Sequence, residues 1–160
     1  MIQTASNDGT EQNALKSKFL GIESQMKGML GKIAAGRVVE AFDILSRVTD
    51  ALVTNCESLG LTSDKPIFEG FDRIKFWRTI NQCWMYAIRN ADTATSSEQR
   101  LREEHFEHLR KSIVMWCDVL QKYGLVDYDM GFSETLITGL LVDAQSKLVN
   151  QKASDVEPKK

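Results

Sequence analysis

The sequence predicts an all-α fold: a single domain built as a bundle of about five antiparallel helices. Apolar residues recur at alternating steps of three and four along most of the chain, which places them on one face of a helix. No segment sustains the alternation of apolar and polar residues that is typical of a half-buried strand. The 160 residues include only two prolines, so the length suits one hydrophobic core and the chain has few forced breaks.

The first two helices are expected to form a tight hairpin. The first apolar stripe consists of Leu15, Phe19, Ile22, Met26, Met29 and Ile33. Gly36 follows as a C-terminal cap, because a residue without Cβ adopts the left-handed conformation at little cost. The second stripe begins at Val38 and continues to "ESLGL", in which Gly60 and the leucine after it suit a Schellman cap. So few residues separate the two stripes that the helices should be antiparallel neighbours.

Three further stripes complete the predicted bundle. They cover residues 68 or 71 to 88, residues 101–123 and residues 136–148. Ser96 and Gln99 have the spacing of a capping box, which predicts the start of the fourth helix. A second glycine-leucine pair, in "KYGLV", is expected to stop that helix.

Both ends of the chain lie outside these stripes. Residues 1–12 and residues 151–160 are polar and have no apolar face. Without apolar surface to bury, such segments do not offset the entropy of ordering. The sequence therefore predicts a flexible N-terminus over residues 1–12, a helical bundle domain over residues 13–150 and a disordered tail over residues 151–160.

Composition and charge exclude several classes of function. Lys and Arg number 20 against 22 Asp and Glu, a net charge of -2, so the basic excess that drives nucleic-acid binding is missing. We expect no nucleic-acid partner. The longest uncharged runs, such as "TLITGLLV", fall far short of the roughly 20 apolar residues that cross a bilayer, so we expect no membrane span. The polar start "MIQTASNDGTEQN" lacks the features of a signal peptide.

The cysteines favour a reducing compartment. Cys56, Cys83 and Cys117 are odd in number, widely separated and each embedded in an apolar helical pattern. This arrangement is typical of buried reduced thiols and not of a disulfide framework or a zinc knuckle. The sequence therefore predicts a soluble protein of the cytoplasm or nucleus.

The stretch "KYGLVDYDMGFSE" holds the densest group of oxygen ligands in the chain. A calcium loop that starts at Asp127 requires an oxygen ligand, a glycine and a glutamate at its fifth, sixth and twelfth positions. The sequence has Gly131, Phe132 and Thr138 there. The stretch is better explained as a turn in which Gly131 takes a positive φ and Ser133 caps the fifth helix.

A histidine pair is the second polar cluster. His105 and His108 are three residues apart, so they share one face of a helix and can hold a metal ion together. A catalytic zinc needs at least three protein ligands, and neither a His-Glu-x-x-His nor a paired Glu-x-x-His motif is present. Asp127, Asp129 or Glu134 would have to fold back to complete the site. A solvated, charged helix start explains the pair without a metal, and we expect no cofactor.

The aromatic segment "FDRIKFWRTINQCWMY" is the most distinctive candidate for binding. Phe76 and Tyr86 fall off the core stripe of this helix, beside Arg73, Lys75 and Arg78. Off-stripe aromatic residues with basic neighbours are typical of protein interfaces, where Trp, Tyr and Arg act as anchors. We therefore expect Arg73, Lys75, Phe76 and Arg78 to bind a protein partner. The same aromatic residues can equally be covered by the fifth helix or by a loop.

Two functional hypotheses from different classes fit the sequence. The first is a non-enzymatic interaction or accessory module that binds a protein partner, since no catalytic set is assembled in the sequence. The alternative is a helical protein with an internal pocket for an apolar small molecule, an accessory or an enzyme of specialised metabolism. Its expected lining is Trp77, Trp84 and Trp116.

Three motifs carry a resemblance to known proteins. Together, "ESLGL", "RIKFWRTINQCW" and "CDVLQKYGLVDYDMGFSETLITGLL" resemble small uncharacterised fungal all-helical proteins. The resemblance covers roughly residues 15–148 and rests on packing and cap residues. It implies an all-helical fold and a fungal context of accessory proteins to larger enzymes or to specialised metabolism, and it implies no catalytic residue.

Overall fold

The described residues of the protein form a bundle of five α-helices. The structure, a computed structural model, describes residues 2–63, 65–127 and 130–156. The helices are α1 (Ile2–Ala34), α2 (Val38–Thr54), α3 (Arg73–Arg89), α4 (Glu103–Gln121) and α5 (Glu134–Val156), with 3-10 turns η1 (Ala91–Thr93) and η2 (Ser97–Gln99) between α3 and α4. The described residues contain no strand, only an isolated antiparallel bridge between Val126 and Gly131. The predicted all-α single-domain bundle is confirmed.

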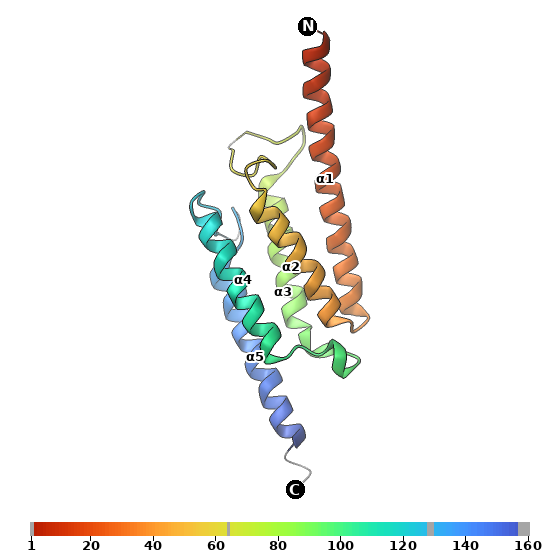
Figure 1. Cartoon of the computed structure of the whole chain (residues 1–160), viewed down its shortest axis with the longest axis vertical. Coiled ribbons are helices and arrows are strands. Elements are labelled where there is room, and N and C mark those ends of the chain that lie inside the picture. Colours follow the sequence, from red (N-terminus) through yellow and green to blue (C-terminus); the bar gives the residue numbers. More distant parts are fainter. Residues whose placement is uncertain (1, 64, 128–129, 157–160) are drawn as a thin grey trace.

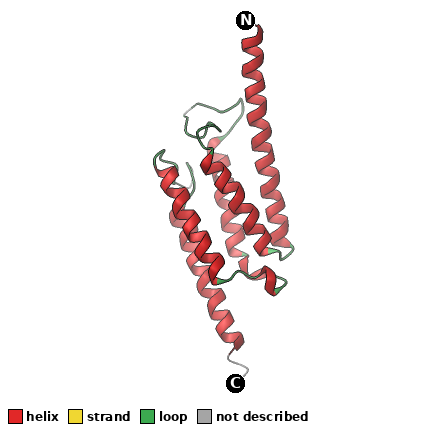
Figure 2. Cartoon of the chain, in the orientation of Figure 1, coloured by secondary structure: helices red, strands yellow, loops and turns green. Residues whose placement is uncertain are grey.

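Successive helices run in opposite directions, so α1, α3 and α5 point one way and α2 and α4 the other (Figure 1). α1 and α2 form the predicted hairpin and lie on one side of the bundle, while α4 and α5 lie on the other (Figure 2). α3 packs against helices of both halves. The N-terminal part of α1 extends beyond the other helices at the end that carries the α2–α3 loop, which we call the upper end (Figure 1).

The terminal helices are longer than the apolar pattern predicts. α1 begins at Ile2 and α5 ends at Val156, so the backbone is helical over residues 2–12 and 151–156, where the sequence predicts a flexible segment and a disordered tail. Once a packed stripe has nucleated a helix, each added residue gains a backbone hydrogen bond without needing an apolar face. Residue 1 and residues 157–160 lie outside the described residues. No helix in the described part of the chain is long and apolar enough to cross a membrane.

The predicted glycine caps are confirmed. Three helical segments end at a glycine with positive φ, whose successor donates its N–H to a carbonyl five residues back: Gly36 (Arg37 to Lys32, 2.9 Å), Gly60 (Leu61 to Cys56, 2.9 Å) and Gly124 (Leu125 to Leu120, 3.0 Å). These bonds are those of a Schellman motif. α2 itself ends at Thr54, and turns continue to Gly60.

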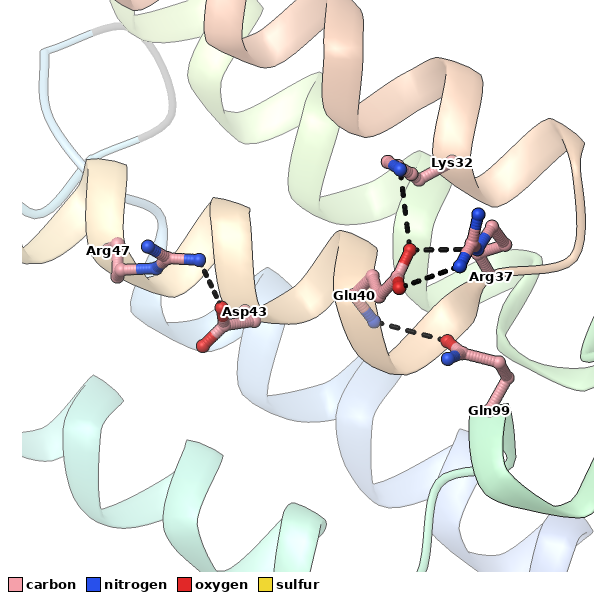
Figure 3. Close-up of polar contacts among 6 residues, drawn as sticks. All are labelled: Lys32, Arg37, Glu40, Asp43, Arg47 and Gln99. Carbon is pink, nitrogen blue, oxygen red and sulfur yellow. Dashed lines mark hydrogen bonds and ion pairs between the residues drawn. The ribbon is translucent and has the colours of Figure 1, made fainter.

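The predicted capping box at Ser96 and Gln99 is wrong, because α4 begins only at Glu103. There the Nδ1 atom of His105 accepts the N–H of Arg102 at 2.8 Å. Gln99 caps a different helix: its Oε1 accepts the N–H of Glu40, in the first turn of α2, at 3.2 Å (Figure 3). The spacing in the sequence correctly identified Gln99 as a capping residue, but it did not identify the helix that Gln99 caps.

Ion pairs join the residues around this cap. The carboxylate of Glu40 accepts from Nε and Nη2 of Arg37 at 2.8 and 2.9 Å, and Lys32 Nζ lies 3.4 Å away (Figure 3). The N–H of Thr95 also donates to the carbonyl of Gly36 at 3.1 Å. The segment after α3 therefore closes the turn between α1 and α2 at the lower end of the bundle.

Candidate binding groove between α1 and α3

The residue predicted as the aromatic anchor of a partner surface lies inside the protein. Phe76 is only 7% exposed, so the exposed placement is wrong and the alternative, that this ring is covered by another part of the protein, is confirmed. Its ring packs edge-on against Phe19 of α1, with centroids 5.0 Å apart. α3 is covered on this side by α1, a neighbour that a stripe drawn on α3 alone does not reveal. Conversely, Ile74, which falls on the predicted apolar stripe that ends at residue 88, is 44% exposed, while Tyr86 is exposed as expected.

The three basic residues predicted beside Phe76 have different surroundings. Arg73 Nη2 donates to the carbonyl of Lys65 at 2.9 Å and so holds the α2–α3 loop against the start of α3. Lys75 is exposed and lines the groove described below. Arg78 is exposed and does not line it. The structure thus brings only Lys75 and Phe76 together at one candidate site.

The three tryptophans expected to line an internal pocket are packed against other rings. Trp84 lies 5.7 Å from Trp116 and 5.6 Å from Phe132 between ring centroids, and all three are at most 2% exposed. Trp77 is 1% exposed and contacts Phe76 at 5.7 Å. None of the three tryptophans lines either of the two hollows described below.

Two of these indoles have hydrogen-bond partners on α2. Trp84 Nε1 donates to Thr49 Oγ1 and Trp116 Nε1 to Asp50 Oδ1, both at 3.0 Å. A buried N–H that already has an acceptor gains nothing from a ligand. These two tryptophans therefore join α2, α3 and α4 within a closed aromatic core, which we define as Trp84, Trp116 and Phe132 with their direct neighbours.

Asn81 is a structural residue that the sequence pattern did not single out. It is fully buried; its Nδ2 donates to the carbonyl of Gly131, and its Oδ1 accepts the N–H of Ser133, both at 2.9 Å. One side chain of α3 thereby fixes the loop before α5. The sequence did contain a sign of this role: Asn81 lies on the same helix face as Trp77 and Trp84, and a polar residue on a buried face needs hydrogen-bond partners inside the protein.

The acidic stretch before α5 is part of this loop. Gly131 has φ +131, as its predicted role in a turn requires, and a Cβ there would lie 1.9 Å from the Leu125 carbonyl carbon. Phe132 N–H donates to Leu125 O at 3.0 Å, and Ser133 directly precedes α5, where its carbonyl accepts the N–H of Ile137. The described part of the stretch acts as a turn and a helix start; Asp129 lies outside the described residues.

The histidines lie far from Asp127, one of the carboxylates expected to complete a metal site. His105 is in the first turn of α4, whereas Asp127 follows the other end of that helix. At 1.5 Å per residue, the intervening helix alone spans about 24 Å. His108 is exposed, and among the described residues no three His, Cys, Asp or Glu side chains gather as metal ligands.

A groove of about 720 Å³ lies between α1 and α3. The upper part of the groove is bordered by Phe68, Gly70 and Phe71 of the α2–α3 loop. On α1 the lining consists of Lys16, Phe19, Leu20, Ile22, Glu23, Met26, Lys27 and Leu30, and on α3 of Asp72, Lys75, Phe76, Thr79, Ile80 and Cys83. The floor is therefore mainly apolar, and the charged side chains lie along its edges.

Phenylalanines pack closely at the upper end of the floor. Phe19 lies 4.8 Å from Phe71 and 6.1 Å from Phe68 between ring centroids, and Phe68 lies 5.1 Å from Phe71. Phe19 and Phe76 are buried, whereas Phe68 and Phe71 are half-buried. Tilted and edge-on contacts are favourable geometries for aromatic rings, so these contacts fix the positions of the side chains that form the upper floor of the groove.

The edges of the groove are helical stripes. On α1, Lys16, Leu20, Glu23 and Lys27 follow one another at steps of four, three and four, so they share one face. Leu20 is 56% exposed, the highest fraction among the large apolar side chains described as exposed. An apolar side chain in that position keeps contact with water unless another molecule covers the groove.

The thiol on the groove floor is unsuited to nucleophilic chemistry. Burial raises the pKa of Cys83 to about 11, so it stays protonated at neutral pH. Burial, followed by the charges of Glu134 and Asp118, raises the pKa of Cys117 to about 12. The pKa of Cys56 is also raised, mainly by burial. All three cysteines are buried and free, in agreement with the predicted reduced thiols.

A second, smaller hollow of about 380 Å³ lies beside the η1–η2 segment. Its lining includes Thr95, Ser96, Arg100 and Leu148. Arg100 already interacts with other residues of the protein. The hollow therefore lacks both the apolar floor and the exposed apolar edge of the α1–α3 groove.

Comparison with known proteins gives no further guide to the site: no protein-family model, no curated protein and no solved structure matches this chain. The resemblance to small fungal helical proteins stays a prediction.

Proposed function

We propose that the protein is a non-enzymatic interaction module that binds a partner protein by receiving one of its helices in the groove between α1 and α3. The observation that carries this proposal is the combination of a groove of about 720 Å³ with an exposed leucine on its edge. An apolar groove bordered by polar residues is typical of surfaces that bind other proteins.

The shape of the groove supports a helix as the occupant. Its α1 edge extends from Lys16 to Leu30, about 21 Å at 1.5 Å per residue, which equals four helical turns. An amphipathic helix docked in such a groove contributes apolar anchors at i, i+3 or i+4, and i+7. The half-buried rings of Phe68 and Phe71 offer rigid surface for such anchors.

The volume of the groove also supports the second hypothesis, an apolar small molecule. Small-molecule sites typically measure about 300–1,000 Å³. The helix is favoured here because the groove is open along an edge where Leu20 reaches solvent, whereas small-molecule sites bury most of the ligand surface.

A site-specific photo-crosslinking experiment tests the proposal. A photoreactive amino acid replaces Leu20 in one version of the protein and Val114 in the other, and each is irradiated in an extract of its native cells. Val114 is the matched control because it is 55% exposed but lies on α4, away from the groove. We expect a discrete protein adduct from position 20 that is absent from position 114.

The same experiment identifies the failure of the proposal. Equal adduct patterns at both positions would contradict the groove as the binding surface. If position 20 gives no protein adduct and native mass spectrometry finds a small molecule retained by the protein, the second hypothesis replaces the first.

A further inference from the structure

The charges along the groove carry information about its occupant. Lys16 and Lys27 on α1 and Lys75 on α3 are exposed at its edges. None of the three forms an ion pair with a described residue of this chain. Elsewhere, by contrast, Lys32 pairs with Glu40 and Lys111 with Glu107.

Two carboxylates share the groove with these lysines, and one of them is engaged by the start of α3. Asp72 precedes α3, where its Oδ1 accepts the N–H of Lys75 at 3.0 Å, so it acts as the N-cap of the helix. Glu23 is exposed and has no ion-pair partner among the described residues. Three ammonium groups and two carboxylates therefore line the groove, so its charged side chains keep a net positive charge.

The order of these charges is specific. Along the α1 edge the sequence of signs is positive at Lys16, negative at Glu23 and positive at Lys27. The two lysines are about 16 Å apart along the helix axis, or three turns. Lys75 adds a positive charge on the α3 edge, in the first turn of that helix at the upper end.

From this arrangement we infer that the partner contributes an acidic amphipathic helix, with carboxylates about three turns apart on the side that faces α1 and one further carboxylate opposite Lys75. The inference rests on the proposed function, because it specifies the chemistry of the helix that the groove receives. Complementary charges at the rim of an interface select the partner and its register, while the apolar floor supplies the contact area.

Three synthetic peptides test this inference against the full-length protein. Each is a fluorescent 18-residue helix with leucines at positions i, i+4, i+7 and i+11; its flanking positions are Glu, Gln or Lys. Binding is measured by fluorescence anisotropy at low and high salt. We expect the Glu-flanked peptide to bind about tenfold more tightly than the Lys-flanked peptide, and the difference to shrink in high salt.

Charge-reversal variants locate the effect. The double variant Lys16→Glu and Lys27→Glu should reverse the preference between the Glu- and Lys-flanked peptides. Lys147→Glu, on the exposed surface of α5, changes the net charge without touching the groove and should leave the preference unchanged. Because all three positions are exposed, these variants are expected to fold.

The outcomes separate the inference from the proposed function. If the three peptides bind equally and Leu20→Asp abolishes binding of all of them, the groove receives helices but the acidic preference is wrong. If none binds while a fluorescent fatty acid does, both the inference and the proposed function are overturned. Self-association abolished by Leu20→Asp would overturn the inference by showing that a second copy occupies the groove.

Discussion

The closed aromatic core and the α1–α3 groove are built from similar parts but differ in how they are covered. In the core, the rings of Trp84, Trp116 and Phe132 lie 5.6–6.2 Å apart and are at most 2% exposed. In the groove, Phe19 lies 4.8 Å from Phe71, a similar contact distance, yet Phe71 is only half-buried. Ring contacts alone therefore do not separate core from binding surface.

The difference arises from the number of helices around each cluster. Elements α2, α3, α4 and the segment before α5 all contribute to the closed core. Among the described residues, only those of α1, α3 and the α2–α3 loop line the groove. A cluster with an uncovered side can bury its remaining apolar surface against a partner, whereas a fully enclosed cluster can only stabilise the fold.

The largest effect is expected in the closed core. Trp84→Ala should lower the free energy of unfolding by about 3–5 kcal/mol, because it removes a fully buried ring and leaves Thr49 Oγ1 without its donor. Phe68→Ala, which truncates a half-buried ring at the groove, should cost less than half as much. Urea unfolding followed by circular dichroism measures both; equal losses would contradict the contrast between the two regions.

The loop that closes the core comes next. Gly131→Ala should destabilise the protein by about 3 kcal/mol, because the residue has φ +131 and the added methyl group would overlap the backbone of Leu125. Gly139→Ala is the matched control: it lies within α5 with nothing within 4 Å of an added Cβ, and should stabilise by up to about 1 kcal/mol. Thermal unfolding of the two variants should therefore shift in opposite directions.

A somewhat smaller loss is expected for the side chain that fixes this loop. Asn81→Ala should cost about 2 kcal/mol, since it leaves the carbonyl of Gly131 and the N–H of Ser133 without their buried partner. Asn13→Ala, at an exposed position of α1, provides the comparison and should change the unfolding free energy by less than about 0.5 kcal/mol. A neutral result for Asn81→Ala would mean that the loop is held by other contacts.

A chemical probe distinguishes Cys83 in the groove from an ordinary exposed thiol without altering the fold. An exposed thiol has an ordinary pKa of 9.0, so above pH 9 it is mainly ionised. Burial raises the pKa of Cys83 to about 11, so between pH 9 and 11 this thiol is still mainly protonated. The labelling rate at Cys83 should therefore keep rising through pH 10 by about tenfold per pH unit. Peptide mapping by mass spectrometry follows it; a plateau above pH 9 would contradict the raised pKa.

The sequence was sufficient for the fold because helix stripes and stops are local properties. The spacing from Leu15 to Ile33 predicted the first helix, and the glycine-leucine pairs predicted the Schellman caps, all from residues close in the chain. The start of α1 at Ile2 and the end of α5 at Val156 were not predicted, because the sequence has no apolar stripe at these two ends.

The candidate site was largely missed because it depends on which helices lie side by side. A stripe on α3 cannot show that α1 covers Phe76, and Ser96 and Gln99 cannot show that the glutamine caps α2. Only Lys75 and Phe76 of the predicted partner surface line the groove. The one sequence signal for its open side was Leu20, a large apolar residue beside the stripe of the first helix.

Blocking the groove tests its role in binding most directly. Thr79 is exposed on the α3 edge of the groove, so Thr79→Trp places a ring inside it, while Val114→Trp places the same ring on α4. Affinity for the protein crosslinked at position 20 is then measured with both variants. We expect Thr79→Trp to weaken binding at least about tenfold and Val114→Trp to leave it unchanged, with equal unfolding midpoints. Unchanged binding by a folded Thr79→Trp protein would contradict the groove as the binding site.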